Sequence, residues 1–130
     1  MPDLSLVDLP GITKIPLKGS DHPDNIEEIT MNLCAKYIQD TRTIILCVVM
    51  ANVDITTSDA IKLAKKYDPE GERTLCALTK ADMMIKGQDI RNILHNDDVP
   101  LKYGYVATLG RSPEDMNNHM NVQEGLEKER

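Results

Sequence analysis

Aromatic residues are scarce in this sequence, which has no phenylalanine, no tryptophan and only 4 tyrosines in 130 residues. A folded core must therefore be filled by leucine, isoleucine, valine, alanine and methionine. Hydrophobic residues still make up 41% of the chain, which is an ordinary share for one domain of this length. The composition favours a single domain in which helices pack against a β-sheet.

Basic residues are in the minority, because 15 lysines and arginines stand against 21 aspartates and glutamates and give a net charge of −6. A surface that binds nucleic acid is expected to be basic. The charge balance therefore argues against nucleic acid as a partner.

Long apolar runs and cysteine pairs are missing too. The longest apolar run, Ile44 to Ala51, is far too short to span a bilayer, and the first residues do not resemble a signal peptide. Cys34, Cys47 and Cys76 lie in apolar stretches without Cys-x-x-Cys spacing, so we expect buried, reduced thiols rather than disulfides or a zinc site. These features predict a soluble cytoplasmic protein.

Four apolar runs predict β-strands, and amphipathic stretches between them predict helices. The strands are expected at Leu4–Val7, Thr43–Met50, Thr74–Leu78 and Tyr103–Leu109. The helices are expected at residues 24–38, with Asp24 as the N-cap, and at residues 58–67 and 88–95. This alternation with short connections is typical of an α/β fold with a parallel sheet, in which ligands bind beyond the carboxyl ends of the strands.

Asp8 and Gly11 follow the first predicted strand, at the edge where a ligand is expected. The Asp8 carboxylate is suited to hold Mg²⁺ through water, because that ion prefers oxygen ligands and keeps part of its hydration shell. Gly11 lets a backbone N–H approach a phosphate oxygen, because it has no Cβ. The same spacing also occurs in ordinary turns that end a strand.

The segment Thr79-Lys80-Ala81-Asp82 follows the third predicted strand and has the residues that a guanine site requires. One carboxylate can accept both the ring N–H and the exocyclic amine of guanine, and adenine does not offer this pair. A lysine stem can lie along the face of the base. The alternative is a strand followed by a solvated loop.

Several segments, in this order, resemble the GTPase domain of the dynamin superfamily, which includes the Mx proteins. They are Pro2–Ile12, Ala51–Asp54, Ser58–Ala60, Asp68–Gly71, Thr79–Asp82 and Lys102–Tyr105. The resemblance implies that residues 1–113 are part of a P-loop-GTPase-like domain, with a mostly parallel sheet of about four strands flanked by helices. Residues 114–130 would be a polar tail or the start of a further helix, and from Met116 onward we expect fraying.

The resemblance implies GTP, GDP and Mg²⁺ as ligands. Asp8 would take part in holding the Mg²⁺ and Gly11 would contact the terminal phosphate. The guanine pocket would be formed by Thr79, Lys80 and Asp82.

Two further loops have implied roles. Arg111 and Ser112 would belong to the last base-binding loop. The loop with Asn52 and Asp54 would contact a second GTPase domain when two domains associate through their nucleotide faces. In the intact parent, hydrolysis of GTP to GDP and phosphate would be coupled to self-assembly and membrane remodelling, with a peripheral link to membranes or microtubules.

The sequence departs from the family pattern at two positions. Gly110 stands where many relatives carry asparagine, so one contact to the base must come from the backbone or be lost. Ile85 stands where relatives often carry an acidic residue.

The phosphate-loop pattern Gly-x-x-x-x-Gly-Lys-[Ser/Thr] does not occur in the 130 residues. In the family, the strand before that loop lies between the first two strands expected here. We therefore expect these two strands either to pair directly or to leave a gap prone to association.

The principal interpretation is the carboxyl-side part of a dynamin-like GTPase domain. A rival interpretation is a truncated, non-catalytic remnant that acts as an interaction module through the loop around Asp54 and an exposed sheet edge. An unrelated α/β nucleotide-binding protein is the third alternative.

Residues 1–130 on their own are expected to hydrolyse little or no GTP. The phosphate loop and its Mg²⁺-binding hydroxyl supply much of the electrostatic stabilisation in phosphoryl transfer. Phosphate release from GTP by the purified chain would measure this, and turnover above the buffer blank would contradict the expectation.

Overall fold

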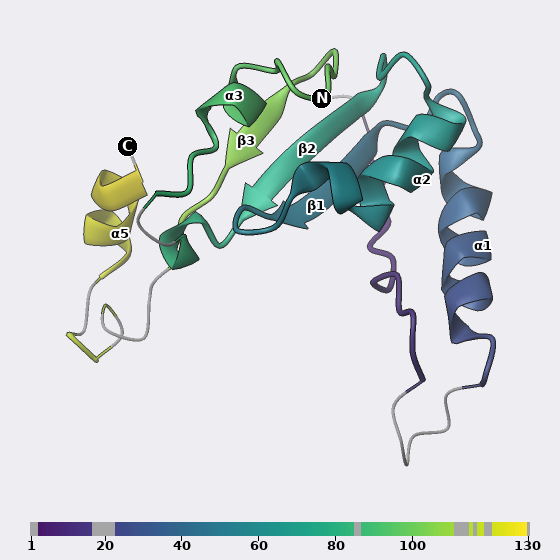
Figure 1. Ribbon diagram of the computed structural model, residues 1–130, viewed down its shortest axis with the longest axis horizontal. Helices are drawn as coiled ribbons and strands as arrows, with labels where there is room; N and C mark the ends of the chain where they lie inside the picture. Colours follow the sequence, from purple (N-terminus) through teal and green to yellow (C-terminus); the bar gives the residue numbers. More distant parts are fainter. Residues whose placement is uncertain are drawn as a thin grey trace. The chain divides into compact units, whose positions relative to one another are not determined.

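The computed structural model describes residues 3–16, 23–84, 87–110, 115, 117–118 and 121–129. The chain divides into two compact units, Met1–Thr43 and Ile44–Arg130, and each is described by itself. The first unit contains helix α1, and the second contains the β-sheet and the remaining helices (Figure 1).

Helix α1 spans Ile26–Ile38, which confirms the first predicted helix. Its N-cap is Asn25 rather than Asp24, because the carbonyl of Asn25 accepts the first helical hydrogen bond, from the N–H of Ile29 at 3.1 Å. The side chain of Asn25 makes no capping bond. The N-cap assignment to Asp24 was therefore wrong by one residue.

The predicted strand at Leu4–Val7 is wrong, because residues 3–16 contain no helix or strand. Leu4 is 79% exposed and Leu6 is 86% exposed. An extended segment needs a hydrogen-bonded neighbour to satisfy its backbone groups, and this stretch belongs to no sheet. The apolar pattern alone was not sufficient to form a strand.

The second unit contains three parallel strands among its described residues: β1 (Ile45–Met50), β2 (Thr74–Thr79) and β3 (Tyr105–Ala107). They are ordered β1-β2-β3, and their arrows point the same way in Figure 1. The α/β fold with a parallel sheet is therefore confirmed, with three strands rather than four. β3 is shorter than the predicted strand, and β1 lies at an edge of the sheet.

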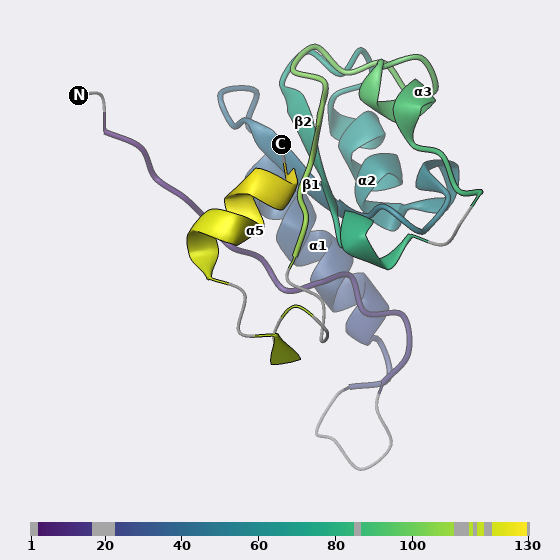
Figure 2. The same ribbon diagram turned by 90° about the vertical axis from the view of Figure 1, so that its left-hand side faces the viewer.

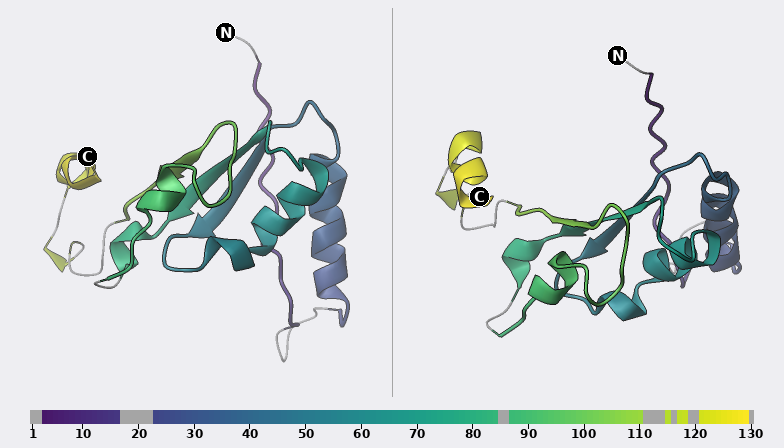
Figure 3. Two further views of the ribbon diagram at one scale, coloured as in Figure 1. Left: turned by 45° about the horizontal axis from the view of Figure 1, so that its top comes forward. Right: turned by 90° about the horizontal axis from the view of Figure 1, so that it is seen from above.

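Helix α2 (Asp59–Tyr67) confirms the second predicted helix and packs against β1. Ser58 is its N-cap, with the side-chain oxygen accepting a hydrogen bond from the N–H of Ile61 at 3.5 Å. The thiol of Cys47 in β1 donates to the carbonyl of Ala60 at 3.6 Å. The third predicted helix is shortened to α3 (Arg91–Leu94), which lies on the same side of the sheet as α2 (Figures 2 and 3).

The two faces of the sheet differ in burial because side chains alternate along each strand. One face is buried, and its core residues are Ile45, Cys47, Val49, Cys76 and Leu78. The other face exposes large apolar side chains, namely Leu46, Val48, Met50 and Val106. Parallel sheets are ordinarily covered on both faces, so this exposed apolar face is unusual.

All three cysteines are buried free thiols, as the sequence predicts. Cys47 and Cys76 are register partners on β1 and β2, and Tyr105 is the partner of Cys76 on β3. Burial raises the pKa of Cys47 to about 12 and that of Cys76 to about 11. These groups are therefore uncharged parts of the core at neutral pH.

Helix α5 spans Val122–Glu129 and corrects the expectation of fraying over those residues. Asn121 and Glu124 form a reciprocal capping box, in which each side chain accepts from the other residue's backbone N–H at 2.9 Å. Residue 114, where the sequence analysis allows a further helix to start, lies outside the described residues. No helix among the described residues is both long and apolar enough to cross a membrane.

The turn between α2 and β2 is held by the buried carboxylate of Asp68. It accepts hydrogen bonds from the N–H groups of Glu72 and Arg73, both at 3.0 Å, and from the hydroxyl of Thr74 at 2.6 Å. Burial by itself raises the pKa of Asp68, but these donors outweigh it and hold the pKa below its ordinary value. The carboxylate therefore stabilises the folded state.

Replacing Asp68 with asparagine is expected to lower the free energy of unfolding by about 1–3 kcal/mol, because an amide cannot accept all three bonds. The stabilisation by Asp68 is present above the ordinary carboxyl pKa and is lost as the pH falls through the lower folded value. Urea unfolding at several pH values measures both effects. Glu70→Gln, an exposed change in the same turn, is the control, and equal stability of the two variants would contradict the prediction.

Gly71 and Gly104 offer a matched test of close packing. Their φ angles are +67° and +66°, but a Cβ at Gly71 would lie 2.9 Å from the carbonyl oxygen of Pro100, whereas one at Gly104 would meet nothing within 4 Å. Gly104→Ala should cost about 1–2 kcal/mol for the left-handed backbone. Gly71→Ala should lower the stability measured by thermal unfolding by more than Gly104→Ala does. Equal losses would contradict this prediction, because they would mean that the backbone around Gly71 moves to accept the Cβ at no cost.

Candidate functional site

The loops that follow β1, β2 and β3 lie at one edge of the sheet, because the three strands are parallel and in register (Figure 1). Backbone hydrogen bonds continue beyond the strands at this edge. The N–H of Ala51 donates to the carbonyl of Thr79 at 2.8 Å, and the N–H of Ala81 donates to that of Thr108 at 3.4 Å. The candidate guanine residues therefore start from a backbone that the sheet holds in place.

Lys80 turns the chain out of β2. Its φ of 57° and ψ of 36° place it in the left-handed region, which is uncommon for a residue other than glycine. The short 3₁₀ helix η2 (Ala81–Met83) follows directly, and the N–H of Met83 donates to the carbonyl of Lys80 at 3.0 Å. The side chain of Lys80 is exposed at this edge.

Asp82 projects from η2 and is half-buried. Its Oδ1 accepts a hydrogen bond from the backbone N–H of Gly110 at 2.8 Å, which joins the loop after β2 to the loop after β3. The two residues are 28 positions apart in sequence. The structure thus brings together two of the segments that the sequence analysis placed at the nucleotide edge.

Thr79 is the last residue of β2 and is half-buried. Its hydroxyl donates to the carbonyl of Val49 on β1 at 3.3 Å. This bond fixes the side chain across the two strands. In the described structure Thr79 therefore stabilises the edge from which Lys80 and Asp82 emerge.

Asn52 and Asp54 follow β1 and are both exposed. Asp54 caps the 3₁₀ helix η1 (Ile55–Thr57), with its Oδ1 accepting from the N–H of Thr56 at 2.9 Å and from the hydroxyl of Thr56 at 2.8 Å. These bonds lower the pKa of the Asp54 carboxyl. Asp54 therefore has a structural role in the loop, and its contact with a partner stays a prediction.

Asp8 and Gly11 belong to the first unit, where both are exposed in a segment without secondary structure. A Cβ built at Gly11 would meet nothing within 4 Å, and the hydroxyl of Thr13 donates to the carbonyl of Gly11 at 3.2 Å. Across the described ranges no group of three or more histidine, cysteine, aspartate or glutamate residues is arranged to hold a metal. The roles of Asp8 and Gly11 remain predictions.

Arg111 and Ser112, the other predicted base-contacting residues, lie outside the described residues. Ile85, which the sequence analysis named as a departure from the family pattern, also lies outside them.

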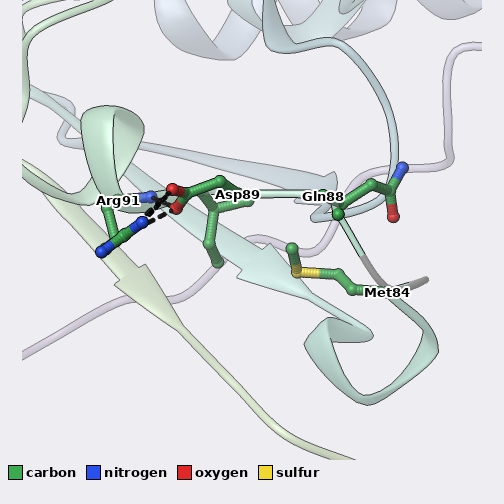
Figure 4. Close-up of a pocket in the computed structure, with 6 residues that line it drawn as sticks. Met84, Gln88, Asp89 and Arg91 are labelled. Atoms are coloured by element: carbon green, nitrogen blue, oxygen red, sulfur yellow. Dashed lines mark hydrogen bonds and ion pairs between the residues drawn. The ribbon is translucent and has the colours of Figure 1, made fainter.

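An open hollow of about 460 Å³ lies beside the loop between η2 and α3. Figure 4 shows Met84, Gln88, Asp89 and Arg91 around it, with Asp89 and Arg91 paired. The guanidinium Nη2 of Arg91 lies 2.6 Å from Oδ2 of Asp89, and this hydrogen bond is the main cause that lowers the pKa of Asp89 to about 2. Both side chains are exposed, so the pair contributes little to stability.

The link between Asp82 and Gly110 was not predicted from the sequence. The sequence analysis expected that, with Gly110 at this position, one contact to the base comes from the backbone or is lost. In the structure the Gly110 N–H contacts the carboxylate of Asp82. No local sequence pattern predicts this hydrogen bond, because it depends on how β2 and β3 are paired.

This chain is similar in sequence to known proteins of one family. A family model described as the dynamin family matches residues 1–81. The interferon-induced GTP-binding protein Mx of Perca fluviatilis is 42% identical over 132 residues, which cover 100% of this chain and 43% of that protein. The dynamin-related protein dnm1 of Schizosaccharomyces pombe is 44% identical over 128 residues, covering 98% of this chain and 16% of that protein.

Dynamin-2 of Bos taurus is 41% identical over 128 residues, which cover 98% of this chain and 14% of that protein. The chain therefore spans less than half the length of each of these relatives. Because the family model matches more than half of the chain, and because these relatives align along nearly all of it, the chain belongs to the dynamin family.

Proposed function

We propose that the chain is the carboxyl-side part of a dynamin-type GTPase domain and that its own residues recognise guanine. The observation that carries this proposal is the position of Asp82. Its carboxylate stands at the carboxyl edge of a parallel sheet, between the loops that follow β2 and β3. Ligands of α/β sheets bind at this edge.

The chemistry of Asp82 suits guanine. An ionised carboxylate has two oxygens and about four lone-pair positions, of which the Gly110 N–H uses one. The remaining positions can accept the ring N–H and the exocyclic amine of guanine together. Adenine presents an acceptor where guanine has its ring N–H, so an adenine nucleotide would offer the carboxylate no donor at that position.

Thr79 and Lys80 support this recognition in different ways. Thr79 fixes the end of β2 through its bond to the carbonyl of Val49. The exposed Lys80 has a long apolar stem that can cover one face of the base. We propose that Arg111 and Ser112 complete the pocket.

We propose that GTP hydrolysis to GDP and phosphate belongs to the longer protein, with Asp8 and Gly11 on the phosphate side. Asp8 has the donor type that Mg²⁺ prefers, and one carboxylate is enough when nucleotide phosphates and water supply the other ligands. Mg²⁺ bound there would neutralise charge on the phosphates. Gly11 would leave room for a phosphate oxygen next to the backbone.

Self-association is the proposed role of the Asn52 and Asp54 loop. The loop is exposed, it lies at the same edge as Asp82, and Asp54 holds it in a defined turn. A contact between two nucleotide faces would use this surface. We further propose a cytoplasmic parent protein that acts peripherally on membranes or microtubules and remodels membranes through self-assembly.

A second candidate function is protein interaction without catalysis. The observation that favours it is the exposed apolar face of the sheet, formed by Leu46, Val48, Met50 and Val106. Exposed apolar surface of this kind commonly marks an interaction site. Guanine-selective binding by this chain would favour the first function over the second.

Titration with fluorescent GTP and ATP analogues tests guanine recognition. The wild-type chain should prefer the guanine nucleotide, and Asp82→Ala should abolish that preference, because loss of hydrogen bonds to a charged acceptor costs about 1.5–3 kcal/mol each. Asp97→Ala removes an exposed carboxylate elsewhere in the same unit and should leave the preference unchanged. Equal, weak binding of both nucleotides by the wild-type chain would contradict the proposal.

A further inference from the structure

We propose that Gly110 is a positioning residue for base recognition, because its backbone N–H orients the carboxylate of Asp82. This inference rests on the proposed guanine site. The hydrogen bond from Gly110 N–H to Asp82 Oδ1 is 2.8 Å long, within the range of charge-assisted bonds. It holds Oδ1 toward the loop that follows β3 and thereby fixes the plane in which the two carboxylate oxygens can meet the base.

Both ends of this bond are held by the sheet. The N–H of Thr108 donates to the carbonyl of Leu78 at 2.8 Å, which continues the pairing of β3 with β2 up to two residues before Gly110. The N–H of Ala81 in turn donates to the carbonyl of Thr108 at 3.4 Å, next to Asp82. The donor and the acceptor are therefore both positioned by the backbone before a nucleotide arrives.

Orientation matters because guanine presents two donors in a fixed plane. A carboxylate that rotates freely must lose that freedom on binding, whereas a held carboxylate loses less. Gly110 N–H occupies one lone-pair position of Oδ1, and three positions remain for the two guanine donors. The bond therefore orients Asp82 without competing with the base.

The absence of a side chain at Gly110 is part of the arrangement. A Cβ at this position would lie 3.3 Å from Asp82 Oδ1, closer than an ordinary van der Waals contact, so the carboxylate would have to move by a few tenths of an ångström. Glycine therefore lets the backbone N–H reach Asp82 with no side chain against the carboxylate.

Amide hydrogen exchange measured by NMR tests the contact directly, without a nucleotide. The Gly110 amide should exchange about tenfold faster or more in Asp82→Ala than in the wild-type chain. The amide of Gly104, which donates to the carbonyl of Leu101 at 3.0 Å, is the internal control and should not change. Unchanged exchange at Gly110 would overturn the proposal.

The functional test compares GTP with inosine triphosphate, which lacks the exocyclic amine. A correctly oriented carboxylate should prefer GTP by about tenfold or more. Gly110→Pro removes the N–H, and it should bring the two affinities close together. Gly110→Ala keeps the N–H but presses on the carboxylate, so its loss of preference should be smaller.

The outcomes separate the two proposals. Wild-type binding without preference for GTP over ATP would refute the guanine site itself. A wild-type chain that prefers GTP over inosine triphosphate, with the same preference in Gly110→Pro, would refute only the role of Gly110. Circular dichroism and thermal unfolding report whether Gly110→Pro is folded. If it is not folded, the amide exchange of Gly110 in Asp82→Ala decides by itself, and unchanged exchange would refute the role of Gly110.

Discussion

The parallel, in-register pairing of β1, β2 and β3 is the constraint on which the candidate site depends. Parallel strands place all their carboxyl ends at one edge, so the loops after them meet although they are distant in sequence. The bonds from Ala51 to Thr79 and from Ala81 to Thr108 extend this pairing into those loops. A change of register between β2 and β3 would therefore separate Asp82 from Gly110 without altering either residue.

The two ends of β2 show how surroundings decide what an aspartate does. Asp68, before the strand, is buried and accepts three hydrogen bonds from its own turn, so it has a structural role. Asp82, after the strand, is half-buried and accepts one hydrogen bond from Gly110. The first carboxylate is occupied by the protein, whereas the second retains further acceptor positions.

Sequence patterns predicted the elements whose stabilisation is local or whose apolar run is long. β1, β2 and α2 were placed within one or two residues, because a β-branched run and a serine cap are strong local signals. The strand expected at Leu4–Val7 did not form, since strand formation needs a neighbour that a local pattern cannot reveal. A helix in residues 114–130 was only one of two alternatives in the sequence analysis, and the bounds of α5 were not predicted, although Asn121 and Glu124 have the spacing of a capping box.

For the site, the sequence predicted Thr79, Lys80 and Asp82, and the structure places them together at the sheet edge. It did not predict the contact between Asp82 and Gly110, because that bond arises from tertiary pairing. The left-handed backbone of Lys80 was not predicted either. Both features concern how the site is held rather than which residues it contains.

The buried thiols of Cys47 and Cys76 have a practical consequence. They face each other across β1 and β2, and their raised pKa values leave almost no thiolate at neutral pH. An alkylating reagent can therefore modify them only in molecules in which the buried face of the sheet has been uncovered, for instance by movement of α2 away from β1. The rate of alkylation of Cys47 and Cys76 would report how often this part of the core opens, with no introduced probe.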